Sequence, residues 1–443
     1  MIDKRILITY SNYILFVLSS LLVTLYIMSY DNVSEKSAWL LLLSFSTFLN
    51  YADIGFSPVL QRFFSYEISN KKSTEEKINK LFFFTHYIYC LISLILILLL
   101  VLSYFYSFSK LVKLDSSLFI LFIIHTVGLI ISFYGKKYVN ALIGLGHIYK
   151  VNYKNSIINS IKLLSVIFLV ITNSGLLSII IAIQSANIAI VVTNYFLSKK
   201  IFKNKNDLTL KEFKEKFNEV FPTVWRGGLA MFFSTGIIEF SNQLMVNNLN
   251  GDELNMYMFN LRIVLMISSF SMIYFSSLTP VYVDLRKNSQ LKNFTSKVLE
   301  SSNKVFLIYW GLSFLYLITV KFEYFGLINL NSNSLFSFVL VLVLFLERHH
   351  GIHMHIYSTQ NKEPWYLFSL FSGSIYLSLL LFISPNNPIL AILLLGLSNL
   401  ILNNWLPVKM SLQSMRCNFG DYFRNSNKFI YLVILLTIII TVI

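Results

Sequence analysis

Charged side chains within long apolar segments are the residues of this sequence with the clearest capacity for chemistry. Arg262 and Glu239 lie about seven residues inside the outer ends of two such segments, roughly 10 Å deep if these are membrane helices. Lys162 and Arg226 lie nearer the inner ends of two others, where both side chains can also snorkel to the surface. An ionised group at the bilayer centre costs from about 2.5 to more than 10 kcal/mol. We therefore expect Arg262 to line a translocation cavity, with Glu239 holding or tuning it, or to form a structural ion pair with Glu239. Lys162 and Arg226 can line the same cavity or snorkel to the inner surface.

The stretch NYADIGFSPVLQRF, residues 50–63, places a carboxylate beside two residues that disturb helices. Gly55 and Pro58 predict a kink, because such residues in a membrane helix free carbonyl groups that neighbours must satisfy. Asp53 then has three open roles. It can orient the bend, pair with Arg62 or with a base on another helix, or carry a proton. Asp53 and Glu239 are the candidate positions for a coupling proton or sodium ion, and no other cofactor is expected.

A histidine-rich stretch, LERHHGIHMHIYSTQNKEPW, occupies residues 346–365. His349 and His353 are four residues apart and can share one helix face, a spacing that metal sites use. Glu347 and Gly351 do not complete a ligand set at that spacing, so we expect no metal. The remaining interpretations are a polar cluster at the membrane surface, or an inner gate that involves His350 and His353.

These side chains must be held by membrane-spanning helices. Of the 443 residues, 56% are hydrophobic and 13% charged, with a mean hydropathy of +0.65. The apolar segments are roughly 18–25 residues long, the length of a helix that crosses a bilayer, and they lack the alternation of barrel strands. We predict spans at 6–28, 38–60, 81–105, 117–135, 155–173, 176–197, 222–247, 256–282, 304–322, 334–357, 365–384 and 388–409, with a short thirteenth at 428–443.

The distribution of basic residues orients these spans. With the N-terminus in the cytoplasm, 29 of the 36 Lys and Arg residues fall in inner loops and four in outer loops. This asymmetry is the positive-inside rule. The net charge of +15 therefore indicates loops that face anionic lipid, and no nucleic-acid partner is expected.

The longest hydrophilic stretch divides the chain into two similar parts. It is predicted as a cytoplasmic linker at 198–220, between an N-terminal six-helix lobe at 1–197 and a C-terminal six-helix lobe at 221–410. Residues 411–443 follow as a cytoplasmic loop and the thirteenth helix. Two helix bundles with a pseudo-two-fold relation around a central cavity are typical of transporters. The predicted fold class is therefore an all-α polytopic membrane protein.

Enzyme signatures are missing from the sequence. It contains no P-loop, no GxSxG and no HExxH motif, so we expect no enzymatic activity and no direct use of ATP. Cys90 and Cys417 are too few for a disulfide framework or a metal clip.

Three stretches resemble polysaccharide transporters of the multidrug/oligosaccharidyl-lipid/polysaccharide exporter (MOP) superfamily, of the O-antigen flippase type. ADIGFSPVLQRFFS (52–65) is similar to the end of the second helix in that family. NNLNGDELNMYMFNLRIV (247–264), with Tyr257 and Arg262, resembles the turn between the seventh and eighth helices. MHIYSTQNKEPWYLF (354–368), with Asn361, resembles the junction after the tenth helix. The chain departs from the related lipid II flippases in having no arginine in its first span.

The resemblance implies a flippase that moves an undecaprenyl-pyrophosphate-linked oligosaccharide, an O-antigen or capsule repeat unit, to the outer leaflet of the bacterial inner membrane by alternating access. Arg262, Lys162 and Arg226 would then bind the pyrophosphate. A glycan polymerase and a chain-length regulator would be partners. The motif residues carried over are Gly55, Arg62, Tyr257 and Asn361. Pro58, His350 and His353 remain candidates for a kink or a gate on the grounds given above.

Two other functions stay open at this stage. A drug or cation exporter of the same superfamily would need an acidic cavity, whereas basic residues outnumber acidic ones within the predicted spans. A membrane glycan polymerase or acyltransferase would need a sizeable outer loop with catalytic residues, and the outer loops, such as SPNNP at 384–388, are short.

Overall fold

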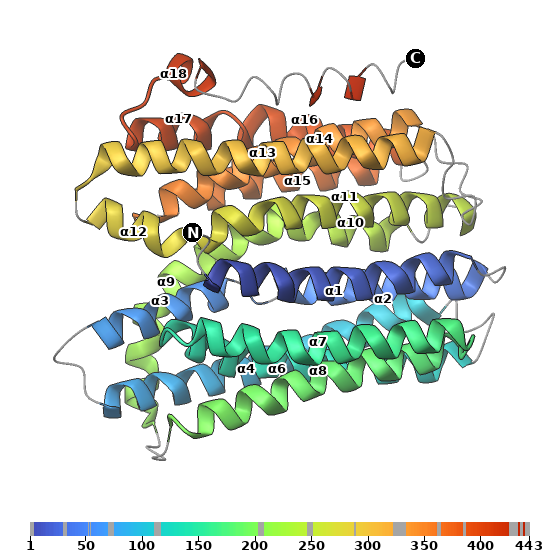
Figure 1. Cartoon of the computed structure of the whole chain (residues 1–443), viewed down its shortest axis with the longest axis horizontal. Helices are drawn as coiled ribbons and strands as arrows, with labels where there is room; N and C mark the ends of the chain where they lie inside the picture. Colours follow the sequence, from blue (N-terminus) through green and yellow to red (C-terminus); the bar gives the residue numbers. More distant parts are fainter. Residues whose placement is uncertain are drawn as a thin grey trace. The chain divides into compact units, whose positions relative to one another are not determined.

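The fold is helical throughout the part of the chain that the structure describes (Figure 1). The structure is a computed structural model of the 443-residue chain. It describes residues 4–29, 33–51, 53, 55–69, 75–109, 117–202, 208–245, 251–287, 289–321, 334–360, 365–383, 387–424, 433–434 and 437–438.

The chain forms two compact units, Met1–Phe232 and Phe233–Ile443. The sequence predicted a second lobe that begins at residue 221. Residues 210–231 form a single helix, however, and this helix packs on helices of the first unit. Part of the predicted linker is therefore helical, and the boundary between the units falls at the C-terminal end of this helix.

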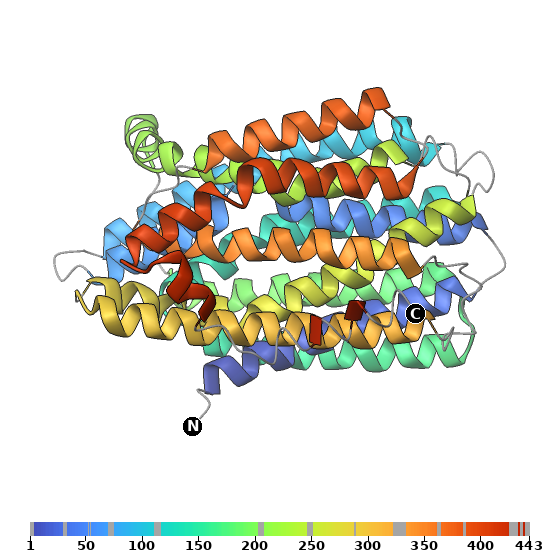
Figure 2. The ribbon, with the colours of Figure 1, turned by 90° about the horizontal axis from the view of Figure 1, so that it is seen from above.

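The first unit is a bundle whose long helices run alongside one another in both views (Figure 1, Figure 2). Its elements are α1 (Lys4–Met28), α2 (Val33–Tyr51), α3 (Phe56–Ser69), α4 (Glu75–Ser103), the π-helix η1 (Tyr104–Phe108), α6 (Ser117–Gly144), α7 (Ile148–Ile171), α8 (Gly175–Lys199) and α9 (Leu210–Met231).

The second unit is a helical bundle in which the central helix α14 contacts α11, α13, α16 and α17. The π-helix η2 (Phe232–Gly236) leads into it. Its further elements are α10 (Ile237–Met245), α11 (Gly251–Ser277), α12 (Thr279–Lys287), α13 (Leu291–Lys321), α14 (Ser334–Ser358), α15 (Tyr366–Ile383), α16 (Pro388–Ser398), the π-helix η3 (Asn399–Asn403), α17 (Leu406–Ser414) and α18 (Phe419–Arg424).

The chain is a multi-pass membrane protein. Among the described residues, eight helices are long and apolar enough to cross a bilayer, or nine if the bent pair α16 and α17 counts as one span. The predicted fold class is confirmed, and most predicted spans fall on one helix each. The predicted spans 38–60, 222–247, 256–282 and 388–409 each cover parts of two or more helices instead. The thirteenth span, 428–443, lies almost wholly outside the described residues.

Small and amide side chains hold the helices of the first unit together. A Cβ atom at Gly135 on α6 would lie 2.5 Å from Cγ2 of Val191, so the glycine allows α6 and α8 to pack closely. Between α1 and α7, Asn159 donates a hydrogen bond to the Asn12 side chain over 2.9 Å. Such interhelical hydrogen bonds satisfy polar groups that lipid cannot. Together these contacts fix the walls of the cavity described next.

Candidate functional site

A cavity of about 340 Å³ lies inside the first unit, lined by residues of α1, α2, α6, α7 and α8. Two lysines contribute to its wall, Lys162 from α7 and Lys136 from α6. None of the lining residues is Asp or Glu. The uncharged polar part of the wall includes Ser19, Ser20, Ser46, Ser132, Gln184 and Asn187. The cavity is therefore basic and polar, as a site for an anion requires.

The two cavity lysines rest on aromatic rings. The Lys162 ammonium lies 4.6 Å from the centre of the Phe16 ring, and the Lys136 ammonium 5.0 Å from that of Phe133. Lys162 is only 3% exposed. Within the described part of the chain, neither ammonium donates a hydrogen bond to a protein group or reaches a carboxylate within 4.0 Å. Each ammonium has three N–H donors, so both retain donors for a ligand.

His125 fixes the polar wall of the cavity. Its Nε2 lies 3.0 Å from the Leu42 carbonyl oxygen, which can only accept, so Nε2 carries the proton. Its Nδ1 then accepts a hydrogen bond from the Gln184 amide over 2.9 Å. His125 is therefore the neutral tautomer, and it orients Gln184. The Gln184 side-chain oxygen accepts in turn from Asn187, 3.2 Å away.

Asp53 caps a helix at the break between α2 and α3. Gly55 has a φ of 76° there, a backbone conformation that glycine adopts without strain. The Asp53 carboxylate is 4% exposed. One of its oxygens accepts the Ser57 amide N–H over 3.0 Å, and the other accepts the Tyr89 hydroxyl over 2.8 Å. The predicted kink is present, and Pro58 occupies the first turn of α3, where it removes no helical hydrogen bond.

A polar network joins this hinge to α6. Asn140 on α6 donates to the Tyr89 hydroxyl over 2.7 Å and accepts from the Gln61 amide over 2.8 Å. Lys136 lies one helical turn before Asn140 and acts electrostatically on Asp53. The base that acts on Asp53 from another helix is thus a residue that also lines the cavity.

The other predicted cations lie outside this cavity. Arg226 is exposed on α9, with its guanidinium carbon 5.6 Å from the centre of the Trp225 ring, and Arg62 is half-buried on α3. In the second unit, Arg262 is 9% exposed on α11, and Tyr257 on the same helix is fully buried. The Glu239 side chain and Asn361 lie outside the described residues.

Within the described residues of the second unit, the histidine stretch is buried only in part. His350 and His353 on α14 are 1% and 0% exposed, and Nε2 of His353 lies 3.2 Å from the Tyr422 hydroxyl. The neighbouring Glu347 carboxylate accepts a hydrogen bond from Asn399 over 2.8 Å. Groups of three or more His, Cys, Asp or Glu that could hold a metal do not occur among the described residues. Glu347, His350 and His353 are thus buried polar side chains of this unit.

The sequence reasoning missed Lys136. It assigned residues 136–154 to an inner loop, but α6 continues to Gly144, so Lys136 and Lys137 lie within the helix. Arg348 was counted with the inner-loop residues in the charge distribution, although it falls within the predicted span 334–357. It lies on α14, where its guanidinium donates to the Ser268 hydroxyl over 2.6 and 2.9 Å. The four-residue spacing of Lys136 and Asn140 was the signal that both could face one side of a longer helix.

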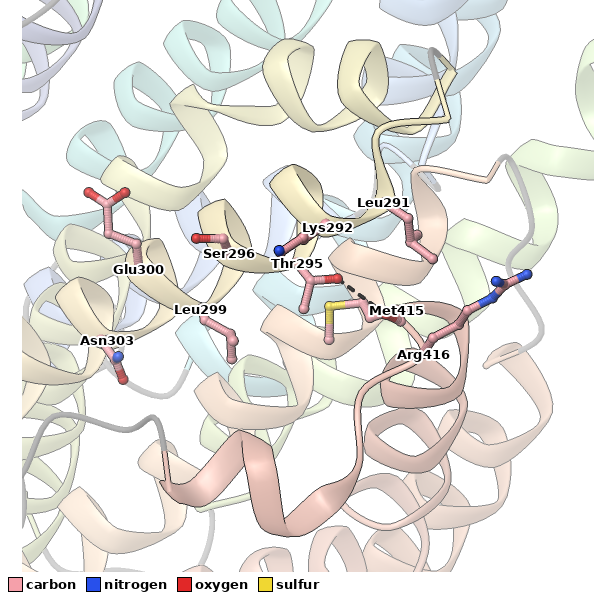
Figure 3. A pocket seen from close by; sticks show the side chains of 9 residues that line it. All are labelled: Leu291, Lys292, Thr295, Ser296, Leu299, Glu300, Asn303, Met415 and Arg416. Atoms are coloured by element: carbon pink, nitrogen blue, oxygen red, sulfur yellow. Dashed lines mark hydrogen bonds between the residues drawn. The ribbon is translucent and has the colours of Figure 1, made fainter.

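A larger groove of about 740 Å³ lies on the second unit, between α13 and the turn after α17 (Figure 3). Lys292, Glu300 and Arg416 line it, and Thr295 donates to the Met415 carbonyl across it over 3.2 Å. Its charges are mixed, and Lys297 and Lys304 already pair with Glu300. We therefore regard the smaller lysine-lined cavity as the better candidate site.

The chain resembles solved structures of membrane transporters. One is the lipid II flippase MurJ in an inward closed conformation: TM-score 0.64, 17% identity, 99% of this chain and 97% of that chain covered. Another is a multidrug resistance MATE family transporter of the MOP superfamily, inward-facing: TM-score 0.62, 12% identity, 91% and 95% covered. A third is a MOP superfamily transporter from Pyrococcus furiosus, described with a binding pocket of reversed polarity: TM-score 0.62, 10% identity, 93% and 94% covered.

These likenesses establish the fold. No protein-family model matches the chain, and no curated protein matches it significantly. At identities of 10–17% a structural likeness carries no substrate with it. The chain has the helical fold of these solved transporters.

Proposed function

We propose that this protein is a flippase for an undecaprenyl-pyrophosphate-linked oligosaccharide, an O-antigen or capsule repeat unit. It moves this lipid from the cytoplasmic to the outer leaflet of the bacterial inner membrane. One observation carries the proposal: the cavity of the first unit is lined by Lys136 and Lys162 and by no carboxylate.

The chemistry of this substrate fits the cavity. A pyrophosphate carries several negative charges, and in a medium of low dielectric constant two ammonium groups attract it strongly. The serines, Gln184 and Asn187 offer hydrogen bonds to phosphate or sugar oxygens. In this proposal Arg262 and Arg226 supply further positive charge along the path, as the sequence resemblance implies.

Transport proceeds by alternating access between the two units, Met1–Phe232 and Phe233–Ile443. Release is coupled to a proton or sodium ion at Asp53 or Glu239. Tyr257, His350, His353 and Asn361 contribute to gating. The protein would work beside a glycan polymerase and a chain-length regulator, with its N-terminus in the cytoplasm. A lipid II flippase is among the solved transporters that share this fold, so the fold is compatible with a lipid-linked substrate.

A drug or cation exporter is the second candidate, because multidrug transporters share the fold. A cationic drug would need acidic groups in its site, and the charged lining of this cavity is basic. A glycan polymerase or acyltransferase has less support, because the structural likenesses are to transporters.

The test is translocation of a polyprenyl-pyrophosphate-linked oligosaccharide in proteoliposomes. Lys162→Gln and Lys136→Gln should each lower the rate at least about tenfold, the loss expected when a hydrogen bond to a charged group is removed. The matched control is Lys154→Gln, an exposed lysine two turns from Lys162 on the same helix. Wild-type rates in both cavity variants would refute the proposal.

A further inference from the structure

Lys136 lies between the cavity and the hinge that Asp53 holds: one helical turn further along α6, Asn140 donates to the Tyr89 hydroxyl, which in turn donates to the Asp53 carboxylate. The Lys136 side chain lines the cavity, and it also acts electrostatically on the buried Asp53 carboxylate. Its ammonium rests on the Phe133 ring and has no protein hydrogen bond within the described residues. A lysine has a flexible four-carbon stem, so its charge can shift between two neighbouring anions.

Asp53 uses its charge to hold the hinge between α2 and α3. The carboxylate accepts the Ser57 amide N–H at the start of α3 and the Tyr89 hydroxyl from α4. A negative charge at a helix N-terminus is stabilising, and a buried carboxylate depends on every favourable charge nearby. If Lys136 moves away from Asp53, the carboxylate loses stabilisation at this position.

We propose that the substrate phosphate and the Asp53 carboxylate compete for the Lys136 ammonium, so that filling the cavity loosens the α2–α3 hinge. This inference rests on the proposed function, because it takes the cavity as the anion site. It adds the coupling between occupancy of the site and a movable part of the fold.

The hinge is packed directly against α9, so a change there is transmitted. A Cβ atom at Gly55 would lie 2.9 Å from the Gly228 nitrogen and 3.2 Å from the Val224 oxygen. The hinge and the backbone of α9 are therefore in close contact, with no space for a side chain between them. This helix is the last one of the first unit, and the chain continues from it into the second. Loosening of the hinge therefore acts first on the segment that connects the two units.

Thermodynamic linkage supplies the test. If an anion weakens the interaction of Lys136 with Asp53, neutralising Asp53 must strengthen anion binding by the same factor. Asp53→Asn removes the charge, while its side-chain oxygen can still accept the Ser57 amide. We expect inorganic pyrophosphate, titrated calorimetrically into the purified full-length protein, to bind Asp53→Asn about fivefold tighter or more than wild type. In a Lys136→Gln background, Asp53→Asn should have a much smaller effect, because only the direct repulsion between the carboxylate and the anion is then removed.

The control is Glu212→Gln, which removes a carboxylate at the start of α9 that does not line the cavity. This variant should leave the affinity for pyrophosphate unchanged.

If Asp53→Asn fails to fold, Asp53→Ser takes its place in the experiment, because serine keeps a side-chain oxygen that can accept a hydrogen bond and carries no charge. Wild-type affinity in the Asp53 variant, with lysine-dependent binding intact, would overturn this inference alone. The same increase in the Lys136→Gln background would overturn it too. Absence of pyrophosphate binding to wild type would overturn the proposed function as well.

Discussion

The backbone of Gly55 lies against the backbone of Gly228, with room for no side chain between them. A Cβ atom at position 55 would stand 2.9 Å from the Gly228 amide nitrogen. Gly55 belongs to the break between α2 and α3, and Gly228 to α9. This contact joins the hinge that Asp53 caps to the last helix of the first unit.

Replacing Gly55 by alanine should destabilise the protein by about 3 kcal/mol, from left-handed backbone strain and overpacking together. Gly146→Ala is the matched control. Gly146 has a similar φ of 83°, but a Cβ there meets nothing within 4 Å, so only the strain applies. Thermal unfolding of the purified variants measures the difference. Equal losses in the two variants would show that the contact with α9 contributes nothing.

Gly135→Ala should loosen the packing of α6 on α8, which forms one wall of the cavity. The new Cβ would lie 2.5 Å from Cγ2 of Val191, and we expect a net loss of about 1 kcal/mol despite the better helix propensity of alanine. Val191→Ala should restore part of this loss in the double variant. Additive effects of the two substitutions on the unfolding midpoint would contradict the close packing.

The sequence predicted the helices well because membrane helices are long apolar segments bounded by polar residues. It also located the kink at Asp53, because Gly55 and Pro58 both disturb helices. It could not place Lys136, because the pair Lys136 and Lys137 follows an apolar segment and therefore predicts a loop. Only the structure shows that α6 continues to Gly144. Nor could the sequence locate the cavity, because Lys136 and Lys162 face one space only through the packing of α6 and α7.

Acid should weaken the attachment of α9 to α4. The Lys80 ammonium, 2.8 Å away, and Thr209 hold the pKa of the Glu212 carboxyl at about 2, below its ordinary value of 4.5. A lowered pKa contributes stability that is full above the ordinary value and is lost as the pH falls towards the lowered one. Between about pH 5 and pH 3 the unfolding temperature of wild type should therefore fall more than that of Glu212→Gln.

High salt should reduce this difference, because both groups are partly exposed. The exposed Glu215 on the same helix provides the control, and Glu215→Gln should keep the wild-type slope. Parallel slopes for wild type and Glu212→Gln would contradict the role of the Lys80–Glu212 pair.

Substitutions of Arg262 test whether the second unit contributes to transport. This arginine is 9% exposed on α11. Arg262→Ala and Arg262→Lys should both lower surface glycan, by roughly tenfold, because lysine lacks the forked donors of a guanidinium. Immunodetection of surface glycan in cells, at matched protein levels, measures the effect. Retained glycan in both variants would remove Arg262 from the mechanism.

The central claim is that the cavity of the first unit takes anions, and its most direct test compares two small ligands of opposite charge. Inorganic pyrophosphate and the lipophilic cation tetraphenylphosphonium are each titrated into purified wild type and into the Lys136→Gln/Lys162→Gln variant. We predict that wild type binds pyrophosphate, that the variant loses this binding, and that neither binds the cation in the cavity. Absence of pyrophosphate binding to wild type, or unchanged binding in the double variant, would contradict the claim. Tetraphenylphosphonium binding that becomes tighter when the two lysines are removed would favour a drug exporter.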